Sequence, residues 1–260
     1  MIPHLGSDNY VIYTYSAIAV ERVLALNDSS GSPIIDVSAV SPLAQQLLQH
    51  LFNLIGKDKN LEQSLAATKV QENEFLMKCV MRVLMVLKES LQQFTDMLLH
   101  NLIEIVNLAA INPSNPRFCY FLFEAIGAVV RYAAPAQPDL VEGALGPAFT
   151  AILETESPDF MPYIYQLFAG LFEANPSATL PDTYKPLISM VTKVDPWLSK
   201  GNVPALVKLV TSLIRRAPQE FVAGNHIEPV LGIFKQLLGT KANELPAFDL
   251  LDSVMISIAP

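Results

Sequence analysis

Residues 115–133 read NPRFCYFLFEAIGAVVRYA, and this stretch decides the fold class. Its apolar side chains recur at intervals of three and four residues, which places them on one face of an α-helix. The residues on this face are Phe118, Phe121, Leu122, Ala125 and Val129. The other side is also apolar, through Cys119, Tyr120, Phe123, Ile126 and Val130. We expect a helix buried on several sides, as in a stack where each helix pair contacts both neighbours.

Two later stretches repeat the same spacing. They comprise Phe160, Ile164, Leu167, Phe168 and Leu171, and then Leu206, Leu209, Val210 and Leu213. Strand-like alternation and hairpin dipeptides such as Asn-Gly are absent from the sequence. The sequence therefore predicts an all-α chain.

Helix starts are marked by a capping side chain directly before a proline. A side-chain oxygen at the cap accepts an unpaired backbone N–H, and proline at the first helical position sacrifices no hydrogen bond. This pattern predicts starts at Ser41-Pro42, Asn115-Pro116, Ser157-Pro158 and Asp195-Pro196.

The starts of alternate helices show a regular period. They fall near Glu72, Pro116, Asp159, Asn202 and Asn243, at intervals of about 44, 43, 43 and 41 residues. HEAT and armadillo repeats have periods of about 40–47 residues and contain two or three helices each. We therefore expect a HEAT-repeat superhelical solenoid of about six helix pairs.

The predicted repeats form a single array over residues 1–260. Their ranges are 8–56, 72–111, 116–156, 158–194, 202–239 and, incomplete, 243–260. Two polar connections, Asn27–Val40 and Lys57–Gln71, are expected to be surface loops. The last segment, 250–258, is apolar and lacks the polar cap that a solenoid needs, so we expect a fragment of a longer chain.

Composition limits the class of protein further. The chain is 51% hydrophobic and 16% charged, enough apolar material for a packed core. The longest apolar runs are interrupted by charge, so we expect no membrane insertion. A net charge of −8 disfavours nucleic acid and favours basic partners. Cys79 and Cys119 have no ligand-like spacing, which indicates neither a disulfide framework nor a zinc site and fits a reducing compartment.

Motifs for catalysis or cofactor binding are missing from the sequence. It contains no glycine-rich phosphate loop, no nucleophile elbow and no paired metal-binding histidines. The nearest arrangement is Asp96, His100 and Glu104, spaced four residues apart, which could hold a metal weakly or perform acid–base chemistry. A solvated helix face is the simpler interpretation, and a partner-facing stripe on the inner surface of the array is a third. We predict no enzyme, no cofactor and no metal.

Three other features have structural and functional interpretations. Arg215 and Arg216 end a helix, where cations complement the helix dipole. Glu154 and Glu156 also end a helix, where the dipole disfavours them. This local cost favours a partner site slightly, although simple solvation is the preferred interpretation. Trp197 is expected to anchor the core rather than an interface.

Several strings resemble the CAS-type (cellular apoptosis susceptibility) exportins of the karyopherin-β superfamily. The strings are residues 72–78 (ENEFLMK) with Met81-Arg82, 112–118 (NPSNPRF) with 123–126 (FEAI), 160–166 (FMPYIYQ), 201–207 (GNVPALV) and 241–243 (KAN). Only the loops at 29–37 and 57–70 fall outside the resemblance, which otherwise covers the chain.

The resemblance implies a function that periodicity does not. CAS-type exportins carry importin-α back to the cytoplasm together with Ran-GTP, and this chain is similar to the middle-to-C-terminal part of such a receptor. The resemblance implies shuttling between nucleus and cytoplasm and contacts with the nuclear pore. It also implies weak or no Ran binding by this segment alone, because the main Ran-binding repeats lie nearer the N-terminus.

The residues expected to contact a partner are acidic side chains on the second helices of the repeats. They are Asp96, Glu104, Glu142, Glu154 and Glu228. The alternative function is a generic HEAT-repeat scaffold subunit of a complex unrelated to nuclear transport.

Overall fold

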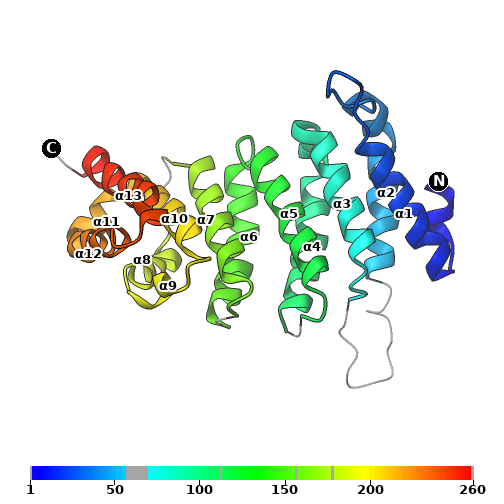
Figure 1. The fold of residues 1–260 in the computed structure, drawn as a ribbon. Coiled ribbons are helices and arrows are strands. Elements are labelled where there is room, and N and C mark those ends of the chain that lie inside the picture. The colour runs from blue at the N-terminus through cyan, green and yellow to red at the C-terminus, as the bar shows by residue number, and fades with distance from the viewer. Residues whose placement is uncertain (1, 57–69, 112, 156, 177–178, 259–260) are drawn as a thin grey trace. The chain divides into compact units, whose positions relative to one another are not determined.

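The computed structural model describes residues 2–56, 70–111, 113–155, 157–176 and 179–258. Within these residues the regular secondary structure is helical, apart from one isolated bridge between Asn27 and Pro33. The chain divides into two compact units, Met1–Ala148 and Phe149–Pro260 (Figure 1).

The first unit is a stack of paired helices. Its elements are η1 (Ile2–Gly6), α1 (Tyr10–Leu24), α2 (Val37–Ile55), α3 (Glu74–Leu87), η3 (Lys88–Phe94), α4 (Thr95–Ile111), α5 (Pro116–Tyr132) and α6 (Pro138–Glu154), which continues into the second unit. Helix α1 packs against α3, and α3 packs against α5. Helices α2 and α4 pack against α3 and α5 respectively. The first helices of successive pairs therefore form one layer.

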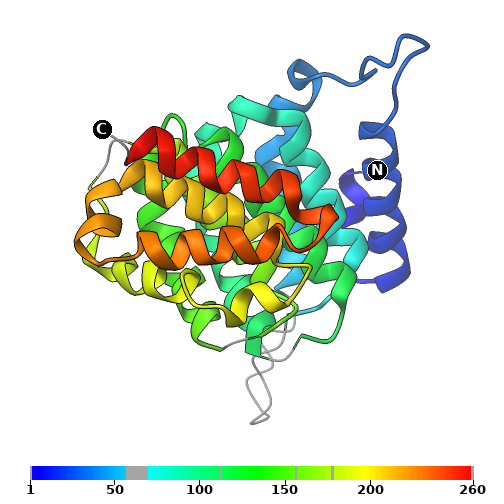
Figure 2. The same ribbon diagram turned by 60° about the vertical axis from the view of Figure 1, so that its left-hand side comes forward.

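The second unit repeats this arrangement with shorter helices. Its elements are α7 (Met161–Ala174), η4 (Asp182–Tyr184), α8 (Lys185–Val191), α9 (Asp195–Leu198), α10 (Val203–Arg216), α11 (Pro218–Ala223), α12 (Ile227–Leu237), η5 (Lys241–Asn243) and α13 (Glu244–Ser257). Helix α10 packs against α7 on one side and α13 on the other. Figure 2 shows α13, in red, lying along α10 and α12.

The predicted starts of the first helices are confirmed to within about two residues. Helix α5 begins at Pro116, and the Asn115 side chain accepts hydrogen bonds from the backbone N–H groups of Arg117 and Phe118 at 3.0 and 3.2 Å. The all-α expectation is confirmed as well. The grouping into six repeats in a single array stays a prediction.

The start predicted at Ser41-Pro42 is wrong. Helix α2 begins at Val37, where the Asp36 side chain accepts from the Ala39 N–H at 3.1 Å, and Pro42 lies inside the helix. Because Asp36 already caps the helix, the proline costs one backbone hydrogen bond beyond the first turn without setting the start. The loop expected over Asn27–Val40 therefore ends at Asp36. Most of the other expected loop, residues 57–69, lies outside the described residues.

Two further proline signals mark turns rather than long helices. The residues after Ser157-Pro158 form a turn closed by the Phe160 N–H and the Ser157 carbonyl at 3.1 Å, and α7 begins only at Met161. Asp195-Pro196 begins the single turn α9. Trp197 in this turn is buried, and its Nε1 donates to the Val191 carbonyl at 2.8 Å. The predicted structural role of Trp197 is confirmed.

The helix that decided the fold class has a deeply buried face. Phe118, Leu122, Ala125 and Val129 are fully buried, whereas Phe121 is half-buried. On the opposite side Tyr120 is 42% exposed, so burial all round the helix was an overestimate. The other residues named on that side are buried.

Both cysteines are buried, and neither forms a disulfide within the described residues. Cys79 lies on α3 and Cys119 on α5. Burial raises the pKa of the Cys79 thiol to about 12, and the negative charge of Glu21 adds to the rise. Cys79 is therefore a packing residue with little thiolate character at neutral pH.

One described stretch, Glu74–Ile111, contains an 18-residue window with a mean hydropathy of 1.3, so by length and composition alone it could cross a membrane. The sequence analysis did not single it out. In the structure it consists of α3, η3 and α4, and the backbone turns at Lys88, where φ is 48°.

Candidate partner-binding surfaces

The polar stripe predicted on α4 lies mainly at the surface. Asp96 and His100 are exposed, and Glu104 is half-buried. A helix rises 1.5 Å per residue, so the two carboxylates stand about 12 Å apart along the axis. No group of three metal-binding side chains occurs in the described part of the chain. The stripe presents separate charges to solvent, as either a solvated face or a partner-facing one does.

Glu142 on α6 differs from the other predicted contact residues. Its side chain is only 6% exposed, between the buried Val141 and Leu145. A charge at this position is not presented on an open face. Reversing it would test folding rather than binding.

The remaining two predicted residues occupy opposite kinds of helix end. Glu228 is exposed in the first turn of α12, where the helix dipole stabilises a carboxylate. Glu154 is exposed as the last residue of α6, where the free carbonyls carry partial negative charge. The helix dipole therefore stabilises the carboxylate of Glu228 and destabilises that of Glu154. Glu156, considered with Glu154, lies outside the described residues.

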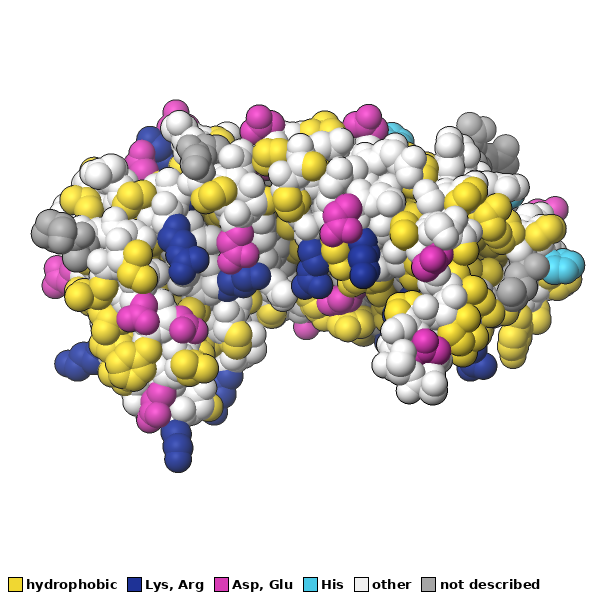
Figure 3. Space-filling view, turned by 90° about the horizontal axis from the view of Figure 1, so that it is seen from above, with side chains coloured by type: hydrophobic (Ala, Val, Ile, Leu, Met, Phe, Trp, Pro, Cys, Tyr) yellow, Lys and Arg dark blue, Asp and Glu magenta, His cyan; other side chains and the backbone are white. Residues whose placement is uncertain are grey.

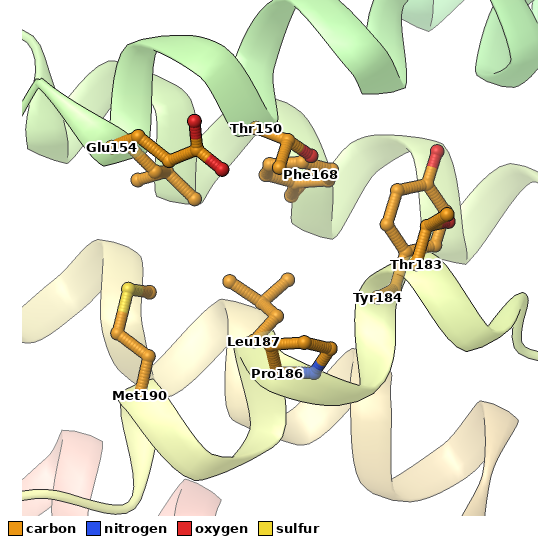
Figure 4. Close-up of a pocket in the computed structure, with 9 residues that line it drawn as sticks. Thr150, Glu154, Phe168, Thr183, Tyr184, Pro186, Leu187 and Met190 are labelled. Atoms are coloured by element: carbon orange, nitrogen blue, oxygen red, sulfur yellow. The ribbon is translucent and has the colours of Figure 1, made fainter.

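Glu154 stands at the edge of a pocket of about 180 Å³ within the second unit. In Figure 4 Glu154 lies on the α6 side of the pocket, across the gap from Leu187 and Met190 of α8. The lining residues are Thr150, Leu153, Glu154, Phe168, Thr183, Tyr184, Pro186, Leu187 and Met190. Among the described residues that line the pocket, Glu154 is the one with a charged side chain.

Glu154 was predicted from the sequence as a contact residue, but the pocket beside it was not. The lining comes from α6, α7, η4 and α8, which are separated along the chain. Helical spacing identifies which residues are buried, but it does not show how far two helices stand apart. The one sequence signal was the unfavourable position of a carboxylate at a helix C-terminus.

Of the pair Arg215-Arg216 at the end of α10, Arg216 has a structural role, as the sequence predicted. Arg216 is buried, with its guanidinium 5.0 Å from the centroid of the Phe172 ring. Its Nη2 donates to the Thr179 carbonyl at 3.4 Å. Arg215 remains exposed at the end of α10.

The net negative charge is not gathered into one patch on the face drawn in Figure 3. Acidic and basic side chains are interspersed there among polar and apolar ones. A partner attracted to this face would meet individual acidic positions rather than a uniform field.

Comparison with known families gives one match over most of the chain. A family described as CAS/CSE protein, C-terminus, matches residues 21–260. The resemblance inferred from the sequence strings is confirmed.

Curated relatives agree with this match. The importin alpha re-exporter of Saccharomyces cerevisiae is 38% identical over 256 residues, which cover 98% of this chain and 26% of the relative. The importin-alpha re-exporter of Schizosaccharomyces pombe is 37% identical over 253 residues, covering 96% and 25%. Exportin-2 of Danio rerio is 32% identical over 260 residues, covering 98% and 26%. The chain therefore spans about a quarter of the length of these relatives.

A solved structure gives the same result in three dimensions. The exportin Cse1 in its cargo-free, cytoplasmic state superposes with a TM-score of 0.78 at 35% identity, covering 98% of this chain and 25% of that chain. The predicted HEAT-repeat solenoid class is confirmed by this match.

Proposed function

The chain belongs to the CAS/CSE protein family, and from this premise we propose that it is a segment of a nuclear export receptor. The longer protein, called the parent below, binds importin-α together with Ran-GTP and returns it to the cytoplasm. The observation that carries this proposal is the 38% identity over nearly the whole chain to a protein named importin alpha re-exporter.

The segment contributes a cargo-binding surface to the parent rather than the main Ran site. About three quarters of each relative lies outside the region matched here. We expect the segment alone to bind Ran-GTP weakly or not at all. The parent shuttles between nucleus and cytoplasm and contacts the nuclear pore on the way.

The mechanism we propose is storage of binding energy in the stacked repeats. Each repeat contacts only its neighbours, so small rotations between repeats add up to a large change of curvature. Cargo and Ran-GTP would then assist each other's binding through one shared conformation, which is a coupling free energy between two sites. An enzymatic function has no support from the relatives, whose names are those of transport receptors.

The test is capture of importin-α by the full-length parent, with and without Ran-GTP. The variant carries Asp96→Lys, Glu104→Lys, Glu154→Lys and Glu228→Lys, and leaves the buried Glu142 unchanged. A matched control reverses two exposed carboxylates on α13, Asp249→Lys and Asp252→Lys.

We expect Ran-GTP-dependent capture by the wild type and the control, and weaker capture by the fourfold variant with its helical content retained. Equal capture by all three proteins would remove the acidic positions from the cargo surface. No capture by the wild type in either condition would favour the generic scaffold.

A further inference from the structure

The charge at the edge of the α6–α8 pocket has no counterion among the residues that the structure describes. Glu154 is exposed and forms no ion pair or hydrogen bond with another described residue. Lys185 lies between two lining residues, but its Nζ is paired with Asp182 at 3.0 Å and with Glu220 at 3.2 Å. The nearby lysine is therefore engaged elsewhere.

The end of α6 adds to the negative potential at this position. The last carbonyls of a helix carry partial negative charge, and Glu154 places a full negative charge beside them. This arrangement costs the free chain some stability. A bound cation would relieve both contributions.

The floor of the pocket is apolar and held in place by aromatic packing. Phe168 is fully buried, and its ring meets those of Phe149 and Tyr184 edge-on, with centroids 5.4 and 5.6 Å apart. Leu153 and Leu187 complete the buried part of the lining. Pockets for drug-sized molecules enclose about 300–1,000 Å³, so a volume of about 180 Å³ suits a single side chain.

We propose that this pocket receives one lysine or arginine side chain of the cargo protein. Its aliphatic stem lies on Leu153, Leu187 and Met190, and its cationic head pairs with Glu154. Long basic side chains bury their stems and keep their charged ends at the surface in this way. A purely apolar side chain would desolvate the Glu154 carboxylate without pairing it, which is unfavourable.

The inference rests on the proposed function, because importin-α is taken as the protein that supplies this side chain. The first experiment measures the Kd of importin-α for the full-length parent in the presence of Ran-GTP. Glu154→Gln removes the charge at nearly constant shape and is expected to weaken binding about tenfold, the equivalent of about 1.4 kcal/mol. Met190→Trp fills the mouth, keeps the charge and is expected to weaken binding similarly.

The matched control is Asp252→Asn, which removes an exposed carboxylate outside the pocket and should leave the Kd unchanged. If the wild type binds importin-α and neither Glu154→Gln nor Met190→Trp weakens binding, the pocket inference fails and the proposed function stands. If the wild type binds no importin-α, both fail.

The second experiment identifies the occupant. A photo-crosslinking amino acid replaces Thr183, an exposed residue of the lining, in the full-length parent. After irradiation of the complex, the crosslinked importin-α peptide is expected to carry a lysine or arginine within two residues of the link. A link to the parent itself, or to an importin-α segment without a basic residue, would overturn the proposal.

Discussion

The contacts that the first helices make with their neighbours differ in kind between the two units. In the first unit, Glu21 of α1 is nearly buried, with 7% of its side chain exposed, and it forms ion pairs with two cations of α3. The Lys78 Nζ lies 3.4 Å from its carboxylate and the Arg82 Nη2 lies 3.2 Å away. The contact between α1 and α3 is therefore set by charge as well as by shape.

Further polar contacts join the same layer. The Asn73 side chain caps α3 and donates through its Nδ2 to the Thr14 hydroxyl of α1 at 2.8 Å. Arg117 of α5 pairs with Glu74 of α3 at 3.1 Å. Polar groups that require particular partners fix which turn of one helix faces which turn of the next.

In the second unit an aromatic cluster joins α7 to α6 and η4 instead. Phe168 and Phe172 of α7 stack with ring centroids 5.7 Å apart, and Tyr184 contacts both. The ion pair between α7 and α10, Glu173 with Lys208 at 3.5 Å, joins two half-exposed side chains. Exposed pairs contribute about 0–1 kcal/mol, so apolar burial dominates here.

The same repeat architecture is therefore stabilised by two kinds of contact. We call the ion pairs of Glu21 with Lys78 and Arg82 the polar seam. We call the ring contacts of Phe149, Phe168, Phe172 and Tyr184 the aromatic seam. A polar seam specifies register and is disrupted by loss of one partner, whereas an aromatic seam supplies more burial and is disrupted by loss of volume. The aromatic seam also supports the floor of the pocket beside Glu154. Three substitutions test the comparison, and the largest effect is expected in the aromatic seam.

Phe168→Ala should lower the free energy of unfolding by about 3–5 kcal/mol, because it leaves a cavity where a fully buried ring meets three others. Chemical denaturation followed by circular dichroism measures the loss. Phe248→Ala is the control, because the Phe248 ring is 51% exposed. It should lower the free energy of unfolding by much less than Phe168→Ala does. Equal losses at the two positions would contradict the aromatic seam.

Glu21→Ala should lower the free energy of unfolding by about 2–3 kcal/mol, because two partly buried cations lose their carboxylate. The same denaturation experiment measures it. Glu173→Ala, at the exposed pair of the second unit, should change stability by about 0.5 kcal/mol or less. If Glu21→Ala lowered the free energy of unfolding no more than Glu173→Ala does, the polar seam would not stabilise the first unit as proposed.

Asn73→Ala should cost about 2 kcal/mol, since it removes a helix cap and leaves the buried Thr14 hydroxyl without this donor. Asn9→Ala removes an exposed cap on α1 and should cost about 1 kcal/mol. Thermal unfolding of the two variants gives the difference. A reversed order would show that the bond to Thr14 adds nothing.

The sequence predicted the positions of helices better than it predicted the contacts between them. The apolar spacing in 118–129 identified the buried face of α5, and Asn115-Pro116 identified its start, because both depend on neighbouring residues. Ser41-Pro42 misled because Asp36, five residues earlier, supplied the cap. Glu21 was not selected at all, since its partners lie 57 and 61 positions further along the chain.

The candidate contact residues show the same limit. A charged residue on a second helix was expected to be exposed, yet Glu142 lies on the flank of the buried face of α6. Exposure depends on how closely the next helix approaches, which the sequence period does not specify. The pocket beside Glu154 could not be predicted either, because it also depends on how closely neighbouring helices approach.

The most direct test of the account is hydrogen exchange of the full-length parent, free and bound to importin-α and Ran-GTP. We predict that binding slows amide exchange in the segments that line the pocket, residues 150–154 and 183–190. The polar seam between α1 and α3 should change less, because both helices already protect it in the free protein. Unchanged exchange throughout the region of this chain, in a complex shown to be intact, would contradict the claim that this segment contacts cargo.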